Sequence, residues 1–306
     1  MAWQDKMLAI KGNFLQPDAT GVNDATVDAT SSAFLNDASR WENTMNYYAS
    51  RPLRFSGISQ SSKFVRFVFP ATRLCDCAAV INVHTNQINA QTNRPPVEAR
   101  YQVRINAGPI TDPTLVMVQD WVSLDLTNAE LWGHNMFFHF AASTAQQTWT
   151  FFFRAASELE VPLNITSLSV GNILLGQLYQ FPGNPLIEHP RHITAVATVI
   201  GRPFGSAQFW QREEAVERLS LDNFHADEIS RVGLTRLIGG RGRRRFTGSE
   251  FARFRLDIPS ALITPDMWES GSSTYGGCVF GRFTGVESGM RVGGQALTSA
   301  QFEEVA

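Results

Sequence analysis

The chain has 306 residues, of which 43% are hydrophobic and 18% are charged, and this composition excludes a largely disordered protein. Its formal net charge is −2, so we expect no overall electrostatic attraction to nucleic acid or to an anionic membrane. The length allows one large β domain or two ordinary domains. With 22 phenylalanines and 23 glycines, the composition favours sheets over helices.

Residues 1–50 are predicted to form an N-terminal arm. Within the arm, residues 18–32 are rich in Asp, Ala and Thr, which predicts either an extended strap or a poorly ordered loop. Trp41, Tyr47 and Tyr48 then supply apolar anchors that would dock on the chain's own core or on a neighbouring subunit. The start of the sequence contains no apolar segment typical of a secretory signal, and we expect no membrane partner.

Residues 51–185 are predicted to form a jelly-roll or β-sandwich domain of short strands separated by Pro, Gly and Asn loops. Residues 63–69 are interpreted as a strand that places Phe64 and Val65, like Phe67 and Val68, on opposite faces, and Pro70 is expected to end it. Residues 77–83 are almost continuously apolar, as expected for a strand that is buried on both faces. Further strands are predicted at 101–105, 116–126, 148–154 and 163–179, with one or two helical turns allowed within 127–140.

The segment 181–185 contains two prolines and a Gly-Asn pair, and it predicts a domain boundary. Beyond it, residues 186–306 are expected to form a β-rich assembly domain. Residues 210–221 suit either a helix or an alternating strand, and 227–238 show helical periodicity. Strands are expected at 193–200 and 253–258, and glycine-rich hairpins within 271–294.

Several of these segments, in order, resemble a group of bacteriophage structural proteins with a galactose-binding-like, or discoidin-like, jelly roll. The resemblance consists of the strand 64–69, the apolar run 78–83 followed by His84-Thr85-Asn86, Trp121, and the aromatic strand 149–154 leading to 170–177. The group usually ends the apolar strand with His-Asn, whereas a threonine intervenes here. The resemblance covers roughly residues 50–185 and implies a jelly roll followed by a β-hairpin extension that is used in assembly.

Motifs of catalysis and metal binding are missing from the sequence, which contains no H-E-x-x-H, no G-x-S-x-G and no P-loop. His134 and His139 are five residues apart, a spacing that would not bring both side chains to one metal ion. The three cysteines, Cys75, Cys77 and Cys278, are interpreted as reduced, small core residues. We therefore expect no enzyme and no cofactor.

An arginine cluster is the main charged feature of the second region. Its centre contains three glycines, and its members are Arg236, Arg241, Arg243, Arg244, Arg245, Arg253 and Arg255. Such a cluster suits an ion-paired contact between subunits, a phosphate contact or a solvated loop. Only Phe246 lies close by, so the aromatic platform that single-stranded nucleic acid needs is not evident.

The sequence thus predicts a structural subunit of a bacteriophage particle, in its tail or baseplate, that acts through contacts between subunits. Its expected partners are other copies of itself and other virion proteins, and its expected location is the virion. The alternative is a glycan-binding module of a fibre or a capsid decoration protein, with the loops 86–96 and 106–113 as candidate sugar sites. A polysaccharide hydrolase is a third and minor hypothesis.

Overall fold

The fold is described from a computed structural model of the chain, and it is mainly β. The structure describes residues 7–15, 24–31, 44–45, 53–58, 62–85, 100–125, 135–156, 165–181, 191–201, 209–226, 260–263, 267–268, 272, 274–292 and 295–304. Within this part of the chain, no helix has the length and apolar character that a membrane span requires.

The described strands belong to one folded antiparallel sheet, in which the order of the main path is β6-β5-β7-β4-β8-β1-β11-β13-β14-β10-β9. Off this path, β12 pairs with β7, β2 with β4 and β3 with β8. The strands are β1 (Leu8–Asn13), β2 (Thr26–Val27), β3 (Leu53–Ile58), β4 (Lys63–Thr85), β5 (Arg100–Gly108), β6 (Val116–Asp125), β7 (Met136–Ala156), β8 (Ile165–Gln180), β9 (Arg191–Gly201), β10 (Phe209–Ala226), β11 (Ser260–Ile263), β12 (Tyr275–Gly277), β13 (Val279–Val292) and β14 (Gln295–Glu304).

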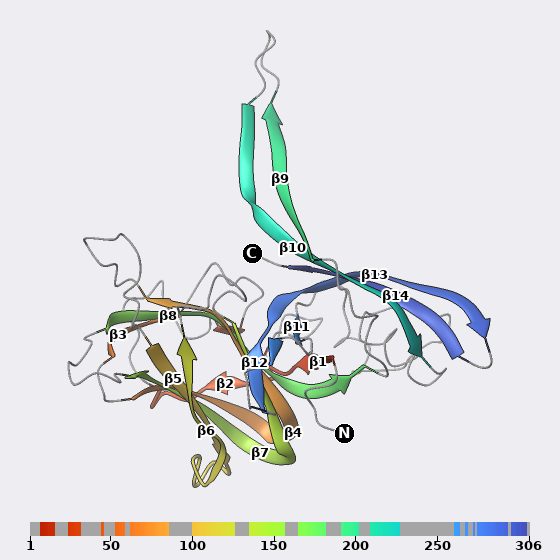
Figure 1. Cartoon of the computed structure of the whole chain (residues 1–306). Helices are drawn as coiled ribbons and strands as arrows, with labels where there is room; N and C mark the ends of the chain where they lie inside the picture. Colours follow the sequence, from red (N-terminus) through yellow and green to blue (C-terminus); the bar gives the residue numbers. More distant parts are fainter. Residues whose placement is uncertain are drawn as a thin grey trace.

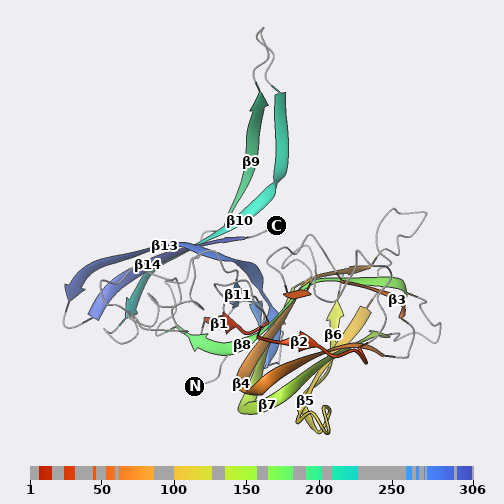
Figure 2. The ribbon, with the colours of Figure 1, turned by 180° about the vertical axis from the view of Figure 1, so that it is seen from behind.

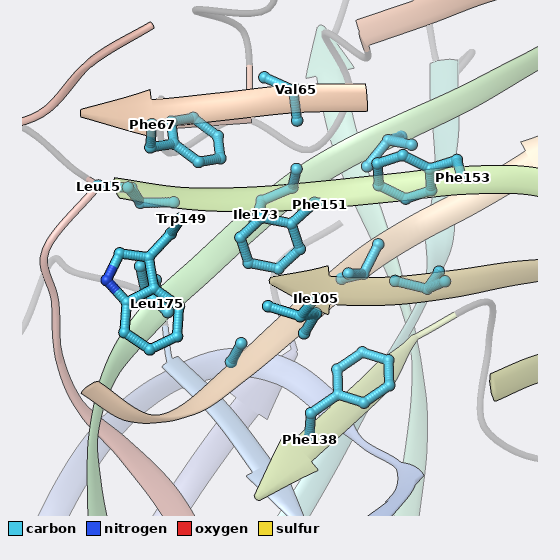
Figure 3. Packing of buried hydrophobic residues seen from close by; sticks show 14 of the residues in the cluster. Leu15, Val65, Phe67, Ile105, Phe138, Trp149, Phe151, Phe153, Ile173 and Leu175 are labelled. Atoms are coloured by element: carbon cyan, nitrogen blue, oxygen red, sulfur yellow. The ribbon is translucent and has the colours of Figure 1, made fainter. Parts of the chain in front are cut away.

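A β-sandwich forms because the long strands change neighbours along their length. The first part of β4 lies between β7 and β2, whereas its later part lies between β7 and β8. The sheet thereby folds over on itself into the layers of the sandwich (Figure 1). Phe67 and Phe151 meet edge to face in the sandwich core, with ring centroids 5.9 Å apart, close to the buried Trp149 (Figure 3).

Residues 77–83 of β4 are buried on both faces, as the sequence predicted. Ala78, Val80 and Val83 belong to the core of the sandwich. Cys77, Ala79 and Ile81 belong to a second core, which is completed by apolar residues of β1, β11 and β13. This one segment therefore joins the sandwich to the rest of the chain.

Asn82 has a φ of 49°, which places it in the left-handed region in the middle of β4. In a regular strand Ile81 and Val83 would lie on one face, yet they belong to different cores. The positive φ breaks the alternation and turns Val83 into the sandwich. The Asn82 amide donates a hydrogen bond of 2.7 Å to the side chain of Asn135, which itself donates to the carbonyl of Cys278 at 3.2 Å.

The second region is an extension of paired ribbons. β13 and β14 form a hairpin, and β14 also pairs with residues 218–226 of β10. The distal part of β10 pairs with β9, and these two strands project away from the body in both views (Figures 1 and 2). The prediction of a mainly β chain, with a sandwich followed by a β-rich extension, is confirmed.

Two details of the sequence-based prediction are settled by these strands. The prediction that Pro70 ends its strand is wrong, because β4 continues to Thr85. Pro70 lies where the register between β4 and β7 shifts, and proline is tolerated there because no ladder hydrogen bond is required of it. Residues 210–221 are strand rather than helix.

Parts of the predicted arm pair with the body. β1 pairs with β8 and β11, and residues 24–31 lie along β4 as a strap, through β2 and through the hydrogen bond from the Asp28 amide to the Arg66 carbonyl. Of the segment 127–140, where one or two helical turns were allowed, residues 136–140 are strand, as part of β7. The rest of that segment up to residue 134, and the predictions for 227–238 and 253–258, fall outside the described residues. The domain boundaries at 50 and 185 stay predictions.

Asn82 provides a direct test of this fold. Asn82→Val should lower the free energy of unfolding by about 1–3 kcal/mol, because a β-branched residue is strained at positive φ. Asn82→Gly removes the same side chain but accepts that φ, so it should cost clearly less. Urea unfolding followed by tryptophan fluorescence measures both variants, and equal losses for the two would contradict the account.

Candidate functional site

One face of the sheet β6-β5-β7-β4 packs against the sandwich core, and the opposite face carries the candidate site. Alternation in each strand separates the two sets of side chains, since Val103 and Ile105 of β5 and Phe151 and Phe153 of β7 are core residues. The residues between them point the other way, and cross-strand pairing sets them in rows. The first row is Ser123, Gln102 and Arg154; the second is Arg104, Phe152 and Phe64; the third is Asn106, Thr150 and Arg66.

Arginine side chains and aromatic rings alternate across this surface. The guanidinium carbon of Arg154 lies 4.0 Å from the centroid of the Trp121 ring. That of Arg104 lies 5.3 Å from the Trp121 centroid and 5.0 Å from that of Phe152. Arg66 lies 5.1 Å from the Phe64 centroid. We call the set Phe64, Arg66, Arg104, Trp121, Phe152 and Arg154 the arginine–aromatic face.

Hydrogen bonds fix the direction of two of these guanidinium groups. Arg154 donates from Nε to Gln102 Oε1 at 2.6 Å, and Arg104 donates from Nε to Asn106 Oδ1 at 3.0 Å. Both acceptors belong to β5, so each arginine is held along the sheet by its Nε. Ring stacking and one hydrogen bond together restrict these long side chains, and this lowers the entropy that each would lose on binding a partner.

Charge pairing divides the arginines of this surface into two kinds. Arg66 pairs with Asp28 of the strap at 3.3 Å, and its Nε donates to Thr150 Oγ1 at 3.0 Å. The pKa of Asp28 is lowered, first by the hydrogen bond from the Thr30 amide and then by Thr30 Oγ1 and Arg66. Among the described residues, no carboxylate pairs with Arg104 or Arg154.

The sequence-predicted interface residues are not among those that the structure describes. The arginine cluster at 236–255 and the anchors Trp41, Tyr47 and Tyr48 fall outside the described residues, so their roles stay predictions. Trp121 was recognised from the sequence as a strand residue only. The sequence did contain a signal for the arginine–aromatic face, because strand alternation assigns certain positions of β5 and β7 to the side opposite the core. These positions are Gln102, Arg104, Phe152 and Arg154.

The candidate sugar loops are only partly described. Residues 86–96 fall outside the described residues, whereas 106–113 form the end of β5 and part of the turn that follows it. This second loop contains no aromatic side chain that could stack on a sugar ring.

Burial holds several titratable groups of the core in their neutral forms. Burial raises the pKa of the thiols of Cys75, Cys77 and Cys278, so these groups remain protonated and poorly nucleophilic. Burial lowers the pKa of His139, with Asp76 acting in the opposite direction. Among the described residues, no three His, Cys, Asp or Glu side chains gather where they could hold a metal ion.

No protein-family model and no curated protein matches the sequence. Solved structures align with about half of it, and three of them are named here. A carbohydrate-binding module of a Clostridium perfringens family 89 glycoside hydrolase shares 12% identity over 52% of this chain and 97% of its own, with a TM-score of 0.30. Chitosan-binding module 1 from Paenibacillus sp. IK-5 shares 9% identity over 53% and 97%, with a TM-score of 0.31. A mutant lectin-binding domain of Lectinolysin, complexed with Lewis b, shares 9% identity over 54% and 95%, with a TM-score of 0.33.

The buried thiols predict how stability depends on pH. An unfolded thiol ionises near its ordinary pKa of 9.0, whereas the folded thiols resist ionisation, so their contribution is present below that pKa and is lost as the pH rises above it. The free energy of unfolding should therefore fall between about pH 8 and pH 10, by up to roughly 1.4 kcal/mol per pH unit for each thiol. Urea titrations across this range measure the slope. Replacing all three cysteines by alanine should flatten it, and an unchanged slope would contradict the account.

Proposed function

We propose that this chain is a structural subunit of a bacteriophage particle, in its tail or baseplate, which acts through contacts with other subunits. One observation supports the assembly role above the rest: the ribbon of β9 and the distal part of β10 projects from the body (Figures 1 and 2). The assignment to a phage particle rests on the resemblance of residues 50–185 to phage structural proteins that was stated from the sequence.

An isolated two-stranded ribbon is at best marginally stable in water. Among the described strands, β9 pairs only with β10, and residues 209–217 of β10 pair only with β9. Both edges of the ribbon thus present backbone groups without a strand beside them. Such edges are templates for pairing with another chain, and natural proteins usually cover or shorten them. A long ribbon with open backbone edges suits contact with a second subunit, which would supply the missing partner strands.

The chain should therefore associate through the β9–β10 ribbon. Ile193 and Glu217 face each other across it, so a two-residue Asn-Gly turn that joins them removes residues 194–216 and still closes a hairpin. Light scattering after size-exclusion chromatography should show oligomers of the full chain, whereas the shortened chain should be monomeric with unchanged thermal unfolding. A full chain that stays monomeric at the highest soluble concentration would contradict the proposal.

Carbohydrate binding is a second candidate, and the surroundings of Trp121 favour it. Sugar sites combine an aromatic ring with hydrogen-bonding side chains. Ser123 is two residues from Trp121 on the same strand and accepts a hydrogen bond of 3.1 Å from Gln102, which in turn accepts one from Arg154, the residue over the Trp121 ring. If sugar binds here, a glycan array should give hits that Trp121→Ala removes. Hits that survive this substitution would exclude this site, and a blank array would exclude the candidate.

A further inference from the structure

Three large apolar side chains are exposed in the turn between β5 and β6 and at the start of β6. Ile110, Leu115 and Met117 are 56%, 63% and 57% exposed. A single exposed apolar residue needs no explanation, but three within eight sequence positions mark a candidate contact surface. We call these three residues the apolar tip. It lies at the end of the sandwich that is remote from the β9–β10 ribbon (Figures 1 and 2).

The turn that carries the apolar tip is fixed by internal hydrogen bonds. Thr148 Oγ1, from the neighbouring strand β7, donates to the Gly108 carbonyl at 2.8 Å, and Asn106 Nδ2 donates to the Thr114 carbonyl at 3.0 Å. At Gly108, a Cβ atom would lie 2.0 Å from the Asp112 carbonyl oxygen, so only glycine fits. Exposed apolar residues on a fixed turn are arranged for docking, because little conformational entropy remains to be lost.

The apolar tip continues into the arginine–aromatic face. Met117 and Trp121 belong to the same strand, four residues and roughly 13 Å apart. Trp121 lies between the guanidinium groups of Arg104 and Arg154, which have no described carboxylate partner. Tryptophan, arginine and methionine are the residue types enriched where proteins bind each other, and the two arginines add a positive charge that a partner can complement.

We propose that the apolar tip and the arginine–aromatic face together form a docking surface for an acidic segment of a partner protein. Large apolar side chains of that segment would cover Ile110, Leu115 and Met117. Its carboxylates would accept hydrogen bonds from the terminal nitrogens of Arg104 and Arg154, whose Nε atoms are already used within the sheet. The inference rests on the proposed assembly role and names the chemistry of one partner.

A protein segment fits this surface better than nucleic acid or sugar does. Nucleic acid would use the guanidinium groups and would leave the aliphatic side chains of the tip uncovered. A sugar ring stacked on Trp121 would likewise leave the aliphatic side chains of the tip uncovered. An acidic segment with apolar residues satisfies both halves of the surface.

A yeast-displayed library of random 16-residue peptides, sorted on the purified full chain, tests the proposal. We expect enriched peptides that combine Asp or Glu with Leu, Phe or Trp. Synthetic copies, measured by fluorescence polarisation, should lose at least tenfold in affinity for the double variant Arg104→Gln/Arg154→Gln. The same loss is expected for the triple variant Ile110→Ser/Leu115→Ser/Met117→Ser, whose positions are too exposed to disturb the core.

Arg73→Gln is the matched control, because Arg73 already pairs with Asp24 at 2.9 Å, and its affinity for the peptides should be unchanged. No enrichment, or enrichment of basic peptides, would overturn the proposal. Binding of an oligodeoxythymidine or a sulfated oligosaccharide that is lost in the Arg104→Gln/Arg154→Gln variant, together with no binding of acidic peptides, would also overturn it. Light scattering on the same samples separates this result from the assembly role: intact self-association without peptide binding would reject the docking surface alone.

Discussion

The burial of residues 77–83 on both faces is the constraint on which the rest of the structure depends. Each face of this short segment belongs to a different hydrophobic core, so neither core is complete without it. Alternation lets one strand serve both cores, and the positive φ of Asn82 then turns Val83 toward the sandwich instead of toward the core that contains Ile81. Burying apolar side chains on two faces of one strand gives a large hydrophobic stabilisation for few ordered residues.

Among the described strands, the outermost ones of this sheet have a partner on one side only. The main path of the sheet ends in β6 on one side and in β9 on the other, and it does not close into a barrel. At the first end lie Trp121 and the apolar tip, and at the second end lies the projecting ribbon. On the proposed role, both ends would gain stability from another protein, in one case through backbone edges and in the other through side chains. A stable body with open strand edges and exposed binding side chains would suit an assembly subunit.

The sequence revealed most of the body, because its strands carry local signals. The apolar run at 77–83 and the alternation at 101–105 and 148–154 were recognisable from a few consecutive residues. Pro70 misled the prediction, because whether a proline ends a strand depends on the neighbouring strand's register, which no local pattern contains. Residues 210–221 were ambiguous, because the spacing of their apolar residues suits both the period of a helix and that of a strand. Their pairing with β9 and β14 shows that they form a strand.

The candidate site was harder to foresee than the fold. Arg104 and Arg154 meet at Trp121 only because β5 lies between β6 and β7, and these residues are far apart in the sequence. Alternation alone assigned each to an outward face, but strand order was needed to bring them together. The exposure of the apolar tip likewise follows from the fixed turn at Gly108, because a sequence with two prolines indicates a turn without showing which side chains it exposes.

Amide hydrogen exchange of the full chain, compared between dilute and concentrated samples, tests the central claim most directly. The account predicts that residues 77–83 exchange slowly at both concentrations, because two cores cover them whatever the state of association. Residues 191–201 of β9 should exchange quickly when dilute and become protected when concentrated, as neighbouring chains cover the open edge. Equal and slow exchange of both segments in the dilute sample would show a self-contained molecule and would contradict the account.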